Sequence, residues 1–219
     1  MEYDLITFDC YGTLIDWETG ITTAFRSMVN SMGKSVCREE IISLFMQEEP
    51  VVESEQYRLY RDVLNETARR MAAHLGIELT RSAAAFLPES LKNWEPFPDT
   101  NEALKKLAER YSLGLLSNVD DDLLGVTRRK FPVQFDLIVT AQQVRSYKPG
   151  RAHFDECRER SMGKRQLHCA QSYFHDVVPC VELGIPVVWV NRNSEPAPEA
   201  GRGPLDTVSD LTGLAGLLT

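Results

Sequence analysis

The fold is decided by the stretch Leu5-Ile6-Thr7-Phe8-Asp9-Cys10-Tyr11-Gly12-Thr13-Leu14. Its first four residues form a short apolar run rich in β-forming side chains, and this run ends at an aspartate followed by a glycine-containing turn. The pattern predicts a buried strand that presents Asp9 at its carboxyl end. Taken alone, the same residues are compatible with an ordinary turn, because Asp and Gly are common turn formers.

Two kinds of pattern follow along the chain. Residues 19–91 carry apolar side chains at helical spacing, and a stretch with two prolines, 94–99, ends this block. Beyond it, apolar runs at 113–116, 135–139 and 186–190 alternate with helical segments, which indicates βαβ units. We therefore predict an α/β protein with a doubly wound, Rossmann-like, mostly parallel sheet. Residues 1–14 and 96–219 form this core, and residues 15–95 form a helical cap inserted after the first strand.

Polar side chains stand after the predicted strands at three further places. They are Ser117-Asn118, Lys148-Pro149, and the pair His175-Asp176 that ends an aromatic run. Each pair has an ordinary explanation: loop composition, a solvated lysine, or a helix cap. Ligands, however, bind at the carboxyl ends of the strands in open α/β sheets. The ordered set therefore predicts one site at that edge.

These residues, in this order, resemble the four motifs of the haloacid dehalogenase superfamily. The matching residues are Asp9-x-Tyr11-Gly12-Thr13-Leu14, Ser117-Asn118, Lys148-Pro149 and Asp176, and the resemblance covers the whole chain, cap included. It implies a hydrolase in which Asp9 is a covalent nucleophile.

The residue type at position 11, here Tyr11, distinguishes two activities within that superfamily. Phosphatases carry a second aspartate at this position, where it acts as general acid and base. A phenol with a pKa near ~10 is poorly matched to that task at neutral pH. The tyrosine instead resembles type II 2-haloacid dehalogenases, whose halide leaves without a proton. This resemblance implies no metal and no cofactor, and it leaves a Mg²⁺-dependent small-molecule phosphatase as an alternative.

The resemblance also implies a mechanism. Asp9 attacks the α-carbon of a 2-substituted carboxylic acid, and water then hydrolyses the resulting ester to a 2-hydroxy acid. Lys148 keeps Asp9 ionised. The other expected roles are carboxylate binding by Thr13 and Ser117, a halide pocket formed by Asn118 and Tyr11, and orientation of Lys148 and the hydrolytic water by Asp176.

Three departures from the dehalogenase pattern leave alternatives open. No arginine lies between Ile41 and Tyr57, where those enzymes place one; Arg58, Arg61, Arg145 and Arg151 are the candidates to replace it. Phe154 stands where they have a tyrosine, and it is expected to line the substrate pocket. Their last motif supplies a serine and an asparagine five and three residues before the aspartate; here Gln171 and Tyr173 stand there.

His175 is an additional titratable group beside Asp176, expected to contact substrate. Several stretches also resemble azetidine-2-carboxylate hydrolases, which displace a ring nitrogen that needs a proton. Ring opening of such an amino acid is the near alternative, and a non-catalytic binding protein is the distant one.

Composition limits the partners. The net charge of −8 disfavours nucleic acid and anionic membranes, and an anionic carboxylic acid substrate would need local cations. No run of residues is long and apolar enough for a membrane span, and the first residues lack a signal-peptide pattern. Five scattered cysteines are expected to be reduced, with Cys10 in the core. We expect a cytoplasmic protein, and the resemblance allows a homodimer.

Overall fold

The computed structural model describes residues 3–196 and 203–219. The chain divides into two compact units: the first comprises Met1–Asp16, Pro96–Asn118 and Arg129–Thr219, and the second Trp17–Glu95 and Val119–Arg128. No helix within the described ranges is long and apolar enough to cross a membrane.

The first unit is built on a six-stranded sheet in the order β3-β2-β1-β4-β5-β6, and every neighbouring pair is parallel. The strands are β1 (Leu5–Phe8), β2 (Ser112–Ser117), β3 (Leu137–Thr140), β4 (Gln166–Ala170), β5 (Val187–Val190) and β6 (Asp206–Val208). The predicted α/β class with a mostly parallel sheet is confirmed. The sequence analysis did not identify β4 or β6, because β4 contains a glutamine and a histidine and β6 is short and polar.

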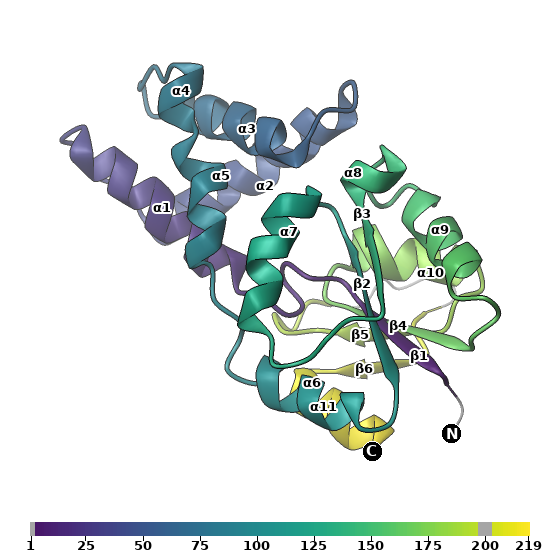
Figure 1. Cartoon of the computed structure of the whole chain (residues 1–219). Helices are drawn as coiled ribbons and strands as arrows, with labels where there is room; N and C mark the ends of the chain where they lie inside the picture. Colours follow the sequence, from purple (N-terminus) through teal and green to yellow (C-terminus); the bar gives the residue numbers. More distant parts are fainter. Residues whose placement is uncertain (1–2, 197–202) are drawn as a thin grey trace. The chain divides into compact units, whose positions relative to one another are not determined.

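Helices cover both faces of this sheet. Figure 1 shows α6 (Thr100–Ala108) and α11 (Leu211–Leu218) on one side, with α9 (Ala152–Arg160) and α10 (Val178–Glu182) on the other. The short α8 (Ala141–Val144) follows β3, the 3₁₀ turn Arg128–Lys130 follows α7 (Asp121–Thr127), and a π-helical turn, Tyr173–Val177, precedes α10. Such helical coverage explains why the central strands read as continuous apolar runs.

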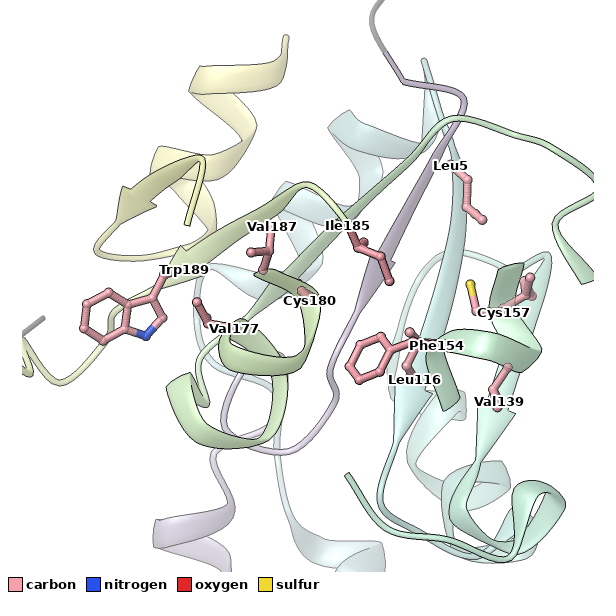
Figure 2. Close-up of a cluster of buried hydrophobic side chains, with 11 residues drawn as sticks. Leu5, Leu116, Val139, Phe154, Cys157, Val177, Cys180, Ile185, Val187 and Trp189 are labelled. Carbon is pink, nitrogen blue, oxygen red and sulfur yellow. The ribbon is translucent and has the colours of Figure 1, made fainter. Parts of the chain in front are cut away.

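The core on the α9 and α10 side is drawn in Figure 2. It contains Leu5, Leu116, Leu137, Val139, Phe154, Cys157, Val177, Cys180, Ile185, Val187 and Trp189, each at most 8% exposed. Side chains alternate along β1, so that Leu5 belongs to this core and Thr7 and Asp9 follow it on the same face. The nucleophile candidate therefore stands at the edge of an apolar layer.

The second unit is helical. It contains α1 (Trp17–Ser31), α2 (Arg38–Ser54), α3 (Tyr60–His74), α4 (Arg81–Ala84), α5 (Phe86–Ser90), the 3₁₀ turn Leu91–Asn93, and α7 (Asp121–Thr127). The sequence analysis placed residues 119–128 with the core, whereas their contacts group them with these helices. The buried Asp120 carboxylate accepts from the backbone N–H groups of Tyr60 (2.7 Å) and Arg61 (3.0 Å), so it caps the start of α3.

Candidate active site

Asp9 lies directly after β1 and is 7% exposed. Its Oδ2 accepts a 2.9 Å hydrogen bond from the hydroxyl of Thr13, and Oδ1 accepts one of 2.9 Å from the ammonium of Lys148. Gly12 has a φ of 99°, a backbone conformation that favours glycine, so the loop can turn back and place Thr13 beside Asp9. The backbone N–H of Gln171 donates to the Thr13 oxygen at 2.9 Å and fixes the direction of its proton.

Lys148 is 1% exposed and uses all three of its N–H groups. They donate to Asp9 Oδ1 (2.9 Å), to the Leu116 carbonyl (2.9 Å) and to Asp176 Oδ1 (2.6 Å). A buried charge requires this kind of full pairing, because a charge without partners in an apolar interior is strongly unfavourable. The ammonium therefore joins the loop after β1, the end of strand β2 and the turn after β4 into one centre.

Asp176 carries a second contact that the sequence analysis missed. Its Oδ1 also lies 3.0 Å from Nε2 of His168, a fully buried residue in the middle of β4. The other ring nitrogen, Nδ1, lies 2.9 Å from Oγ1 of Thr7. The only sequence signal was one histidine inside the otherwise apolar run Leu167–Ala170.

Burial and the neighbouring charges shift the pKa values of Asp9, Lys148 and Asp176, and the two causes act against each other at each group. Burial raises the pKa of the Asp9 carboxyl, and Lys148 opposes that shift. Burial alone would lower the pKa of Lys148, but the charges of Asp176 and Asp9 outweigh it and raise that pKa. For Asp176, burial is outweighed by Lys148 and His168, so its pKa lies below the usual range. Lys148 thus remains an ammonium between two carboxylates.

Two buried oxygen atoms of the centre have no hydrogen-bond partner among the described residues. They are Oγ of Ser117 and Oδ2 of Asp176. An acceptor left unsatisfied in the interior costs about 1–3 kcal/mol, so such atoms mark positions that a ligand or water fills. Ser117 was expected to bind the carboxylate of Asp9 or of a substrate; its hydroxyl does not bond to Asp9 in this structure.

Asn118 joins two loops. Its Oδ1 accepts from the backbone N–H of Lys148 at 2.7 Å, and its Nδ2 donates to the Lys148 carbonyl at 3.1 Å. The amide therefore fixes the backbone that carries the lysine, and the other N–H of Nδ2 makes no hydrogen bond within the described part of the chain.

The remaining predicted site residues differ in exposure. Tyr11 is half-buried in the turn after β1, where it forms a β-bridge with Ile15. His175 is half-buried, and Nδ1 of its ring lies 3.0 Å from Oγ of Ser172. Burial lowers the pKa of this imidazole. Phe154 is only 1% exposed, packed in the apolar core with its ring 5.6 Å from that of His168.

A third histidine lies near the centre without having been predicted. His153 is fully buried on α9, and its Nε2 donates to the Ser117 carbonyl at 3.2 Å. Burial, followed by the charge of Lys148, lowers the pKa of His153 to about 3, so the ring is neutral. Three of the four arginines suggested as replacements for a cap arginine are ion-paired with acidic side chains: Arg58 with Glu55, Arg61 with Asp120, and Arg151 with Asp155.

Comparisons with known proteins identify the family of this chain. Residues 6–190 match the model of the haloacid dehalogenase-like hydrolase family. An (S)-2-haloacid dehalogenase of Pseudomonas putida is 24% identical over 97% of this chain and 95% of its own. Among solved structures, an L-2-haloacid dehalogenase from Xanthobacter autotrophicus with chloropropionic acid covalently bound has a TM-score of 0.85 at 20% identity, covering 99% of this chain and 98% of the other.

A HAD-hydrolase, YfnB from Bacillus subtilis, bound to magnesium, has a TM-score of 0.84 at 15% identity and covers 100% and 99% of the two chains. At these identities the two solved structures support the fold alone. The family model, which covers most of the chain, supports more: this protein is an enzyme of the haloacid dehalogenase-like hydrolase family.

Proposed function

We propose that this enzyme displaces a leaving group from the α-carbon of a small 2-substituted carboxylic acid, with a 2-haloacid as the leading substrate. The observation that carries the proposal is the fixed, buried carboxylate of Asp9 between Lys148 and Thr13, with Tyr11 in the place of an acid. The similarity to an (S)-2-haloacid dehalogenase supports it.

In the first step, a carboxylate oxygen of Asp9 attacks the α-carbon from the side opposite the leaving group. The new C–O bond forms as the carbon–halogen bond breaks, and the halide departs with the bonding electron pair. The hydrogen bonds from Lys148 and Thr13 restrict the rotation of the carboxylate, so its attacking lone pair is already oriented. The product of this step is an ester on Asp9.

In the second step, water attacks the carboxyl carbon of that ester. Oδ2 of Asp176 is the buried acceptor without a partner among the described residues, and it receives one proton of the water. The tetrahedral intermediate then collapses, the ester C–O bond breaks, and the alkoxide takes that proton to leave as a 2-hydroxy acid. The other proton of the water stays on the Asp9 carboxyl and passes to solvent, which regenerates the carboxylate paired with Lys148.

Substrate recognition requires donors for the carboxylate of an anionic substrate. The hydroxyl of Ser117 is one such donor, because it is buried and has no partner in the described part of the chain. The remaining N–H of Asn118 and the side chain of Tyr11 are the proposed contacts of the leaving group.

The centre does not fit magnesium. Mg²⁺ prefers six oxygen ligands in near-octahedral geometry. Here Lys148 binds one oxygen of each carboxylate, and Thr13 binds the second oxygen of Asp9. Nor do residues 3–196 and 203–219 contain three or more His, Cys, Asp or Glu side chains spaced to hold a metal ion. The proposed steps therefore use no metal.

Ring opening of azetidine-2-carboxylate is a second candidate, favoured by the position of His175. A leaving amine must gain a proton, and the ring of His175 lies beside Asp176, tied to Ser172. The covalent step on Asp9 would be the same.

Halide release from (S)- and (R)-2-chloropropionate, without added metal, tests the proposal beside an Asp9→Asn control. Release from one enantiomer, lost in the control, is the expected result. If neither enantiomer releases halide but azetidine-2-carboxylate is opened, the second candidate replaces the first. If no compound of either kind adds mass to Asp9, hydrolysis at an α-carbon is wrong.

A further inference from the structure

We infer that His168 is a positioning residue of this reaction: it holds Asp176 by Oδ1, so that Oδ2 is the atom presented to the hydrolytic water. The expected effect of His168 on the reaction rate rests on the proposed function. Its structural part rests on a string of buried polar atoms that crosses the apolar core beneath the site.

The string begins at the amide of Gln166, whose Nε2 donates to Oγ1 of Thr7 at 2.8 Å. Thr7 and His168 are partners in the register of β1 and β4, and their side chains meet at 2.9 Å. The imidazole then reaches Asp176 at 3.0 Å. Thr7, His168 and Asp176 are all fully buried, in the layer that contains Phe154 and Val187.

The hydrogen-bond pattern fixes where the proton of the imidazole sits. An ionised carboxylate only accepts hydrogen bonds, so Nε2 of His168 carries a hydrogen and donates it to Asp176. With the hydrogen on Nε2, Nδ1 is the ring nitrogen that can accept from the hydroxyl of Thr7. Gln166 donates to that same hydroxyl oxygen, and the Thr7 proton has two acceptors within reach, Nδ1 of the ring at 2.9 Å and the Leu167 carbonyl at 3.4 Å, of which the ring nitrogen is the nearer. The tautomer is therefore set by partners on both sides.

Both donors to Asp176 converge on one oxygen. Lys148 donates to Oδ1 at 2.6 Å and His168 at 3.0 Å, while Oδ2 is buried without a partner among the described residues. If Lys148 were the single donor, the carboxylate of Asp176 could rotate about its Cβ–Cγ bond and still accept that hydrogen bond. The second donor removes that freedom, because the imidazole is held in β4 and by Thr7. This explains why an apolar core contains a histidine, which otherwise packs less favourably than an aliphatic side chain.

The charged and titratable groups around the ring are Asp176, Lys148 beyond it, and the neutral His153 on α9. The hydrogen bonds of His168 go to Thr7 and Asp176. Among the described residues, none reaches Asp9, whose carboxylate attacks the α-carbon in the first step. The first step should therefore proceed without it, whereas hydrolysis of the ester depends on the orientation of Oδ2.

Three variants separate these roles. His168→Leu removes both hydrogen bonds, and His168→Gln restores an N–H donor of similar reach that cannot ionise. Val187→Ala is the matched control, because Val187 is the register partner of His168 on β5 and belongs to the same core without a polar link to Asp176. Thermal unfolding of all three shows that each is folded before kinetics are compared.

The kinetic measurement is rapid mixing with (S)-2-chloropropionate, followed by intact-protein mass and halide release. We expect His168→Leu to release about one halide per chain and to accumulate the ester on Asp9, with hydrolysis slowed by about 10²-fold. His168→Gln should recover most of the lost rate, and Val187→Ala should accumulate no ester. If His168→Leu slows both steps equally, or hydrolyses the ester as fast as the wild type, the positioning role is wrong.

A substrate-free measurement keeps this test separate from the proposed function. In imidazole NMR spectra of isotope-labelled enzyme, Nε2–H of His168 should be protected from solvent exchange, and its signal should move in Asp176→Asn. If this signal behaves as expected while the wild type acts on no haloacid, the proposed substrate fails but the hydrogen-bonded pair stands. A rapidly exchanging signal unaffected by Asp176→Asn overturns the inference whatever the substrate.

Discussion

Lys148 donates a 2.9 Å hydrogen bond to Oδ1 of Asp9, although the two residues are 139 positions apart in the chain. They meet because β1 and β2 are parallel neighbours, so the loops that follow them and β3 open at the same edge of the sheet. This pair governs the protonation of the Asp9 carboxyl, the proposed nucleophile, and can be tested through pH dependence.

Replacing Lys148 by methionine should move the acid limb of the pH–activity profile upward. Burial already raises the pKa of Asp9, and Lys148 opposes this rise. Without the ammonium, the ionised carboxylate loses a stabilising charge, so its pKa rises further. The profile of kcat/KM against pH measures this shift. Lys164→Met is the control, since that exposed lysine binds Ser112 at the start of β2; an unmoved limb in Lys148→Met would contradict the assignment.

Arg192→Met should destabilise the protein markedly. The guanidinium donates to the Thr13 carbonyl at 2.8 and 3.1 Å and to both oxygens of Asp99 at 3.0 and 3.2 Å, and its side chain is only 11% exposed. Its loss removes the donors to the Thr13 carbonyl and to Oδ1 of Asp99, while Oδ2 of Asp99 keeps the backbone N–H of Leu211 at 2.7 Å, and this should lower the free energy of unfolding by about 2–4 kcal/mol.

Chemical denaturation measures that change. The control is Arg165→Met, which breaks an ion pair with Asp4 that stands largely in solvent, and it should leave the denaturation midpoint unchanged. Equal effects of the two substitutions would show that burial does not govern the strength of these pairs.

Gly20→Ala should destabilise the helical unit. A Cβ at this position of α1 would overlap the indole ring of Trp94, whose Nε1 is held by Ser90 at 3.0 Å. Overpacking of this kind costs about 1–3 kcal/mol. Gly125→Ala in α7 provides the opposite case, because no atom lies within 4 Å of the added carbon, and it should stabilise by about 0.5–1 kcal/mol. Thermal unfolding of the two variants should therefore shift in opposite directions.

Glu49→Gln should make the free energy of unfolding less dependent on pH between about pH 5 and 8. Burial raises the pKa of Glu49, hydrogen-bonded to the Tyr60 hydroxyl, to about 7. A carboxyl with a raised pKa in the folded state stabilises the fold when protonated, and this contribution is lost as pH rises through the folded value. Glutamine cannot ionise, so the variant should gain stability over the wild type as pH rises from about 5 to 8.

Melting temperatures across that range measure the difference. Glu40→Gln, at an exposed position of the same helix, should give a curve parallel to that of the wild type. A parallel curve for Glu49→Gln as well would mean that Glu49 is ionised throughout.

Much of the centre could be predicted because its parts have local signatures. A short apolar run ending in Asp9, a glycine turn before Thr13, and polar residues after later strands are all visible without a structure. The parallel sheet then dictates that these strand ends converge. The sequence alone therefore determined the fold class and the candidate residues Asp9, Thr13, Lys148 and Asp176, which the structure places in one hydrogen-bonded group.

Only the tertiary structure decided which contacts each of these groups makes. His168 and Thr7 are separated by 161 positions, and no local pattern distinguishes a histidine that binds a buried carboxylate from one packed in a strand. Asp120 likewise caps a helix from 60 positions away, which groups residues 119–128 with the helices. The physical reason is the same in both cases: periodicity reports which side chains are buried, whereas the partner of a buried polar atom is chosen by register and loop geometry between distant segments.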